Sequence, residues 1–134
     1  MQPYFFIRTD NQCVKINFTD IAYVEANRNY VRIVAHNRVY LVLLSLKQLE
    51  TILPSNSFCR VHRSFIVSLD CVVSFDQECM YLKVGQEHKK SIIPIGNQYR
   101  KFLHQNIMLV ASEVRQGVKL SSVNIESLME NAKN

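Results

Sequence analysis

Hydrophobic residues occur along the chain in short runs that are rich in branched and aromatic side chains. The runs, in order, are YFFIR, CVKINF, IAYVEA, YVRIVA, VYLVLL, SFIVSL, CVVSFD, MYLKV and KSIIPI. This composition, with a spacing of about ten residues, is typical of antiparallel strands joined by short connections. Residues 27–29, 36–37 and 84–86 supply the asparagine or glycine that tight turns favour. The pattern therefore predicts a mainly β fold of antiparallel strands.

One segment follows the helical period between these runs. In SLKQLETILP, which begins at Ser45, the leucines share one helical face. Ser45 and Gln48 fit a capping box, and Pro54 is placed to end the helix. A short core-covering helix is therefore predicted over residues 45–53.

A second helix is expected after the last strand, in NQYRKFLHQNIMLV. Asn97 can cap it, and the aromatic and aliphatic side chains that follow form one apolar stripe over residues 97–109. Residues 1–110 are then one domain, and residues 111–134 a linker and an amphipathic C-terminal helix over residues 124–132. A helix of that length needs a packing partner, and we expect it to pack on its own domain rather than to mediate self-association.

The stretch FCRVHRSFIVSL, which begins at Phe58, fits neither strand pattern. A half-buried strand alternates apolar and polar residues, and a fully buried strand is apolar throughout. Arg60, His62 and Arg63 instead place three ionisable side chains within four residues, on both sides of an extended chain. The cluster therefore needs an explanation other than core formation.

Length and composition indicate an ordinary folded protein. The chain has 134 residues, of which 48% are hydrophobic and 20% charged, and this suits one globular domain. No apolar run approaches the roughly 18 residues that cross a bilayer, and the N-terminus lacks the order of a signal peptide. A cytoplasmic protein with no membrane partner is expected.

The chain carries no enzyme motif. It lacks H-E-x-x-H, a P-loop, G-x-G-x-x-G and carboxylates paired at helical spacing, so no catalytic residue, cofactor or small-molecule substrate is expected. The four histidines are too scattered to predict a metal site. Cys13, Cys59, Cys71 and Cys79 lie in strand-like runs without a C-x-x-C pair, and we expect them to be reduced and buried. Cys59 is expected on the face opposite His62, which disfavours a Cys-His nucleophile pair.

The net charge of +5 belongs to the first 110 residues, because acidic and basic residues cancel in the tail. Basic side chains form three groups there: at the turn after IAYVEA, in RVHR, and around the final strand and the start of its helix. Such groups can neutralise phosphates and reach base edges of DNA. Solvated strand ends explain them equally well, and the residues alone favour neither reading.

Three blocks of sequence resemble the LytTR-type DNA-binding domain of bacterial transcription regulators. They are DIAYVEANRNYVRIV, SLKQLETILPSNSFCRVHRSFIVSL and IPIGNQYRKFL, and the resemblance runs from Phe5 to Leu109. It implies small antiparallel sheets with a short intervening helix and a C-terminal helix. It also implies a transcriptional regulator that binds double-stranded DNA sequence-specifically, with loops inserted into successive major grooves.

The resemblance also bears on regulation. Most members of this family carry a receiver domain before the DNA-binding domain, and nothing in this sequence precedes it. The chain is therefore expected to be either a fragment, such as the output domain of a two-component response regulator, or a stand-alone regulator.

The resemblance assigns DNA contacts to the three basic groups. Arg63 is expected to read a base edge, and Arg60 to hold the loops in position. For His62 a DNA contact and a supporting role both remain open. Phosphate contacts are expected from Arg28, Ser64, Lys89 and Arg100. The full set of expected DNA-binding residues is Asn27, Arg28, Asn29, Tyr30, Arg32, His62, Arg63, Ser64, Lys89, Lys90, Asn97, Arg100 and Lys101.

Two positions depart from the family pattern. Ser68 stands where the family usually has asparagine, and Gly96 with Asn97 stands where it usually has Ser-Arg or a similar pair. Because Asn97 can hydrogen-bond adenine or a phosphate, and Arg100 or Lys101 can compensate, an altered site preference is expected. The competing hypothesis is a protein-interaction module whose basic face binds an acidic protein partner. Self-association on DNA repeats also remains open.

Overall fold

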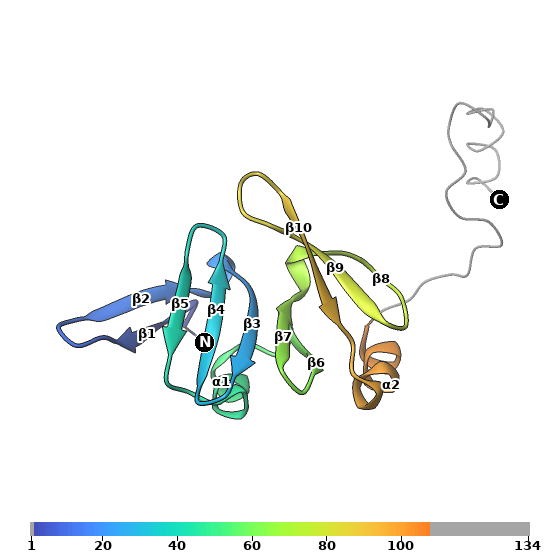
Figure 1. The fold of residues 1–134 in the computed structure, drawn as a ribbon, viewed down its shortest axis with the longest axis horizontal. Coiled ribbons are helices and arrows are strands. Elements are labelled where there is room, and N and C mark those ends of the chain that lie inside the picture. The colour runs from blue at the N-terminus through green and yellow to red at the C-terminus, as the bar shows by residue number, and fades with distance from the viewer. Residues whose placement is uncertain (1, 108–134) are drawn as a thin grey trace, which may run out of the picture.

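The computed structural model of the chain describes residues 2–107, which form strands β1–β10, helices α1 and α2, and two short 3-10 helices (Figure 1). The strands are β1 (Tyr4–Arg8), β2 (Cys13–Asn17), β3 (Ile21–Asn27), β4 (Tyr30–Ala35), β5 (Val39–Val42), β6 (Phe58–His62), β7 (Phe65–Ser68), β8 (Val72–Phe75), β9 (Cys79–Val84) and β10 (Lys89–Pro94). The helices are α1 (Leu46–Ile52) and α2 (Asn97–Asn106), and the 3-10 helices are Phe18–Asp20 and Leu69–Cys71. The helix predicted over residues 124–132 and the domain boundary at residue 110 lie outside the described residues.

The strands form three antiparallel sheets. A two-stranded sheet has the order β1-β2, a five-stranded sheet the order β5-β4-β3-β7-β6, and a three-stranded sheet the order β10-β9-β8. Along the chain, helix α1 connects β3–β5 to β6 and β7 of the five-stranded sheet, and α2 follows the last strand, β10 (Figure 1). The predicted class, small antiparallel sheets with an intervening and a C-terminal helix, is confirmed.

The helix ends show one correct prediction and one error. The capping box of α1 is present: the Ser45 hydroxyl accepts the backbone N–H of Gln48 at 3.1 Å, and the side-chain oxygen Oε1 of Gln48 accepts the backbone N–H of Ser45 at 3.0 Å. Asn97, however, is the first residue of α2 and not its cap. Gly96 takes the cap position in an extended conformation, and its carbonyl accepts the N–H of Tyr99.

Two clusters of buried side chains hold the sheets together. In the first, one face of the five-stranded sheet packs against α1 and the β1–β2 hairpin, with Ile16, Ile33 and Leu49 almost fully buried. In the second, Val61 and Val67 of β6 and β7 pack against the three-stranded sheet and Leu103 of α2. The second cluster therefore fixes α2 and the three-stranded sheet against β6 and β7.

The cysteines are less uniformly buried than expected. All four are free, but only Cys59 is buried, whereas Cys71 and Cys79 are half-buried and Cys13 is exposed. Cys13 is exposed because it lies with Lys15 on the face of β2 opposite the buried Ile16. No helix in the described part of the chain is both long and apolar enough to span a bilayer.

Candidate nucleic-acid interface

The turn between β3 and β4 carries the first basic group. Asn27 and Tyr30 are cross-strand partners, so the connection is two residues long, and Arg28 adopts a left-handed backbone conformation with φ of 56°. The Asn27 side-chain amide donates to the Tyr30 hydroxyl at 3.1 Å, which fixes both side chains across the turn. Arg28 and Asn29 are consequently left exposed at the tip.

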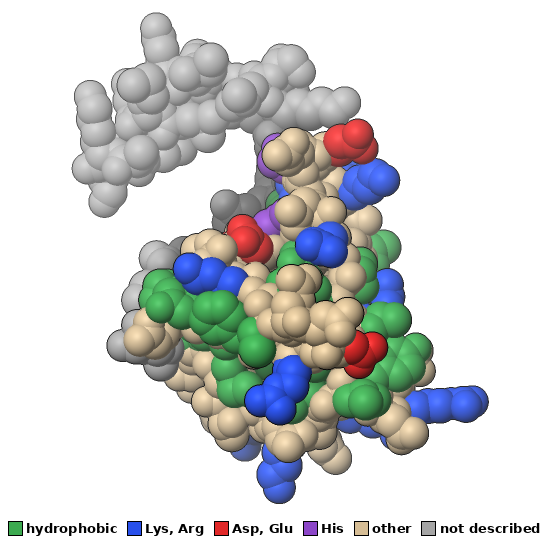
Figure 2. Space-filling view, turned by 90° about the vertical axis from the view of Figure 1, so that its left-hand side faces the viewer, with side chains coloured by type: hydrophobic (Ala, Val, Ile, Leu, Met, Phe, Trp, Pro, Cys, Tyr) green, Lys and Arg blue, Asp and Glu red, His purple; other side chains and the backbone are tan. Residues whose placement is uncertain are grey.

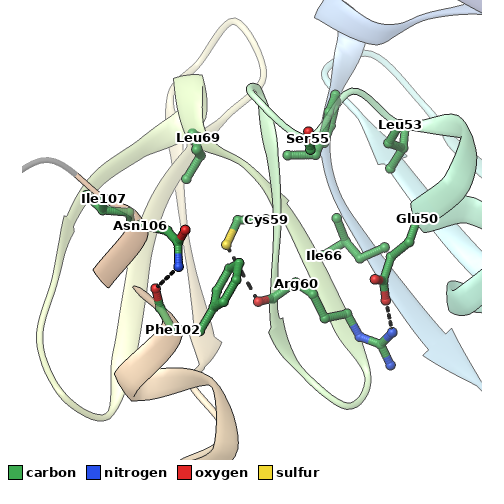
Figure 3. Close-up of a pocket in the computed structure, with 11 residues that line it drawn as sticks. Glu50, Leu53, Ser55, Cys59, Arg60, Ile66, Leu69, Phe102, Asn106 and Ile107 are labelled. Atoms are coloured by element: carbon green, nitrogen blue, oxygen red, sulfur yellow. Dashed lines mark hydrogen bonds and ion pairs between the residues drawn. The ribbon is translucent and has the colours of Figure 1, made fainter. Parts of the chain in front are cut away.

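The turn between β6 and β7 carries the second basic group, and the Arg60 side chain hydrogen-bonds to the backbone of this turn. The Arg60 guanidinium donates to the backbone carbonyls of His62, at 2.9 Å, and Arg63, at 2.5 Å. Its remaining nitrogen pairs with Glu50 of α1, as Figure 3 shows. Arg60 thus ties the turn to helix α1. This is the supporting position expected for it.

His62 and Ser64 complete the turn. The backbone N–H of Ser64 donates to Nδ1 of His62 at 3.0 Å, and Nε2 makes no hydrogen bond to any residue from 2 to 107. The ring also packs edge-on against Phe65, with 5.6 Å between ring centroids. Arg63 is exposed, and within residues 2–107 its guanidinium makes no hydrogen bond or ion pair.

The start of α2 carries the third group and lies directly against this turn. The backbone N–H of Gly96 donates to the carbonyl of Val61 at 2.8 Å. A Cβ atom at Gly96 would lie 3.1 Å from the Tyr99 ring and 3.6 Å from Cα of His62, so glycine permits this close approach. Asn97 and Lys101 are exposed beside the turn, and Arg100 is half-buried, with an Nε atom that has no partner among the described residues.

Backbone pairing places the three groups in a row. Glu25 of β3 pairs with Phe65 of β7, and the N–H of Ala26 donates to the carbonyl of Ser64 at 2.8 Å, so the first two turns are neighbours. Gly96 then joins α2 to the second turn. We call residues 27–30, 62–64 and 96–101 the contact edge. It lies along the lower edge of the molecule in Figure 1.

Charge on this side of the molecule is largely basic. The contact edge itself contains Arg28, Arg63, Arg100 and Lys101 and no Asp or Glu. Figure 2, viewed from the β1–β2 side, shows Lys and Arg side chains projecting at several points of that side of the molecule. Arg32 is the exception among the predicted residues, because its guanidinium pairs with Glu25 at 2.7 Å. That hydrogen bond raises the pKa of Arg32, so it stays charged but is already partnered.

Lys89 and Lys90 are placed away from the other predicted residues. They begin β10, beside the β9–β10 turn, whereas the third segment of the contact edge, residues 96–101, follows the other end of that strand. Lys89 instead lines a pocket with His36 of the β4–β5 turn, at the opposite end of β4 from Arg28. The structure thus places ten of the predicted residues on the contact edge and Arg32 next to it in β4, and it leaves Lys89 and Lys90 outside it.

Sequence reasoning missed two residues that position the site. Glu50 pairs with Arg60 from a helix ten residues earlier in the chain, and Gly96 allows α2 to approach His62. No local pattern identifies either partner. Among the described residues, no three His, Cys, Asp or Glu side chains lie together as a metal site requires.

Comparison with known proteins gives three findings. Residues 11–108 match the LytTr DNA-binding domain family. The heme-containing CO-sensing transcriptional regulator RcoM 1 of Paraburkholderia xenovorans is 40% identical over 63 residues, which are 47% of this chain and 24% of that protein. The solved LytTr DNA-binding domain of a putative methyl-accepting/DNA response regulator from Bacillus cereus superposes with a TM-score of 0.63 at 21% identity, covering 78% of this chain and 96% of that one.

These findings and the fold agree. The chain spans about a quarter of the length of RcoM 1, so that likeness concerns this part of the relative alone. The solved structure shares the fold, and the family match extends over all three segments of the contact edge. The chain therefore belongs to the LytTR DNA-binding domain family.

Proposed function

We propose that the chain binds double-stranded DNA sequence-specifically through the contact edge and so regulates transcription. One observation carries the proposal: three segments far apart in sequence are joined at one edge by backbone hydrogen bonds from Ala26 and Gly96. Three adjacent projections in a row are suited to successive major grooves, where base edges are distinguishable.

Each part of the contact edge has a proposed role. Arg63, exposed and unpaired within residues 2–107, reads a base edge, because a free guanidinium can bond guanine with two hydrogen bonds. Arg28, Ser64 and Arg100 contact phosphates on either side. Asn97 hydrogen-bonds a base or phosphate where the family usually has arginine. Lys89 and Lys90 have no contact in this arrangement.

The relatives suggest the kind of regulator to which this DNA-binding domain belongs. RcoM 1 is a CO-sensing transcriptional regulator, and the Bacillus cereus domain belongs to a putative response regulator. We propose that this chain is likewise the output domain of a cytoplasmic signal-responsive regulator, of which two-component response regulators are one kind. Its signal is then sensed by a part of the regulator other than the contact edge.

The test is a binding selection from random duplex DNA, followed by titration of the selected duplex and a scrambled one. Arg63→Ala is expected to lose about 1 to 3 kcal/mol on the selected duplex and to flatten discrimination at one base pair, with non-specific binding nearly intact. Arg38→Ala is the matched control, since it removes the same charge at the β4–β5 turn, the opposite end of β4. It should bind like the wild type.

The competing function, a module for acidic protein partners, makes different predictions. A module of that kind has no preference among duplexes, so the selection would recover no sequence. DNA binding through several phosphates should also weaken steeply with salt. Recovery of a two-repeat site would additionally indicate that two copies bind side by side.

A further inference from the structure

The outer face of the three-stranded sheet carries two lysines directly opposite one another. Lys83 of β9 and Lys90 of β10 are cross-strand partners and both are exposed. Neither forms an ion pair with any residue from 2 to 107. Like charges in this position destabilise a strand pair. An anion bound between the two ammonium groups would remove that repulsion.

Hydrophobic side chains adjoin the lysines on the same face. Ile92 and Val73 are 62% and 60% exposed, and Tyr81, the cross-strand partner of Ile92, is 36% exposed. A pocket of about 250 Å³ beside Ile92 is lined by Val73, Ser74, Tyr81 and the two lysines. We call this surface the lysine face; its residues are Val73, Ser74, Tyr81, Lys83, Lys90 and Ile92.

The lysine face is separate from the contact edge. Lys90 precedes Gly96 by six residues of nearly extended chain, a span of roughly 20 Å at about 3.3 Å per residue. The composition of the lysine face also differs from that of a phosphate-binding surface. Such a surface needs charge and hydrogen-bond donors but no exposed isoleucine or valine. Contiguous exposed apolar side chains mark surfaces that contact other proteins, and two free lysines beside them are complementary to an acidic partner.

We propose that the lysine face docks an acidic segment of a partner protein. A carboxylate of that segment lies between Lys83 and Lys90, and a neighbouring apolar side chain packs on Val73, Tyr81 and Ile92. The two lysines require a negatively charged segment, and the exposed apolar side chains require that this segment also carry apolar residues. The proposal goes beyond DNA binding and does not rest on it: the chain would hold a protein partner at one surface and DNA at another.

The test uses the whole chain and a labelled peptide that alternates glutamate with leucine or phenylalanine, followed by fluorescence anisotropy. Two control peptides separate the apolar contribution to binding from the charge contribution. Polyglutamate of equal charge lacks the apolar side chains, and the alternating peptide with glutamine in place of glutamate lacks the charge. The double variant Lys83→Gln with Lys90→Gln is expected to weaken binding about tenfold, since two exposed ion pairs are lost. Ile92→Ser should weaken it while the charge is retained.

A matched double variant, Arg38→Gln with Lys47→Gln, removes two charges elsewhere and should bind the peptide like the wild type. The Lys83→Gln and Lys90→Gln single variants should also unfold at higher urea concentration, because each relieves the repulsion. Equal binding of polyglutamate, or peptide binding unchanged in the Lys83/Lys90 double variant, would overturn the proposal. So would a loss of DNA affinity in that variant with a salt slope lower by about two, which would assign the face to nucleic acid.

Discussion

Arg28 combines a strained backbone with an exposed charge. Its φ of 56° at the β3–β4 turn lies in the left-handed region, which costs a residue other than glycine about 1 kcal/mol. Strain of this kind persists where the surrounding structure enforces it, here the pairing of Asn27 with Tyr30. A glycine would fit the turn with less strain but would bring no side-chain charge to a phosphate, so the proposed phosphate contact would account for an arginine here.

Two substitutions separate strain from charge at this residue. Arg28→Gly is expected to be more stable than Arg28→Ala by about 1 kcal/mol in urea unfolding, because only glycine relieves the left-handed strain. Both should reduce the salt slope of DNA binding by about one, because both lose one phosphate contact. Equal stability of the two variants would show that the turn is unstrained, and an unchanged slope would remove Arg28 from the interface.

Thiol reactivity should distinguish the cysteines by burial. Burial raises the pKa of the Cys59 thiol and that of the Cys71 thiol, so less thiolate is present in each at a given pH. At pH 8 a thiol reagent should therefore modify exposed Cys13 first and Cys59 last, as mass spectrometry of the modified chain would show. In denaturant the four rates should converge. Rapid labelling of Cys59 in the folded chain would mean that β6 is open to solvent.

Among the elements, α1 acts on the contact edge through Arg60. Arg60→Met should destabilise the fold by about 2 kcal/mol, because it leaves the turn carbonyls of His62 and Arg63 without their charged donor. Glu50→Gln breaks only the ion pair and should cost less than about 1 kcal/mol. Urea unfolding measures both costs.

The same variants test whether Arg60 touches DNA. Arg60→Met should weaken binding to the selected duplex while leaving the salt slope unchanged, because it loosens the turn without removing a phosphate contact. A slope reduced by about one would instead make Arg60 a direct contact.

The accuracy of sequence-based prediction varied among the elements for physical reasons. Helix α1 was predictable because its start is encoded locally, in the Ser45–Gln48 capping box. Strand β6 was not among the predicted runs, because Arg60 and His62 interrupt its alternation. Both side chains turn back onto the backbone of their own turn, a contact that no periodic pattern reveals. The cap of α2 was misassigned for a similar reason, since Gly96 is fixed by its bond to Val61.

For the whole molecule, the sequence predicted which turns are basic but not at which end of a sheet they lie. In an antiparallel sheet successive turns lie at alternate ends, so Arg28 and His36 are at opposite ends of β4. In the same way β10 separates Lys89 from Asn97. The row formed by the two turns and the start of α2 depends on the pairing of β3 with β7, which joins residues about forty positions apart and has no local signal.

Hydrogen–deuterium exchange of the chain, free and bound to the selected duplex, tests the central claim most directly. The account predicts protection at all three segments of the contact edge, residues 27–30, 62–64 and 96–101, and unchanged exchange at the β9–β10 turn near Lys89 and Lys90. A scrambled duplex at the same salt concentration should give weaker protection. Protection confined to the β9–β10 turn, or equal protection by both duplexes, would contradict the account.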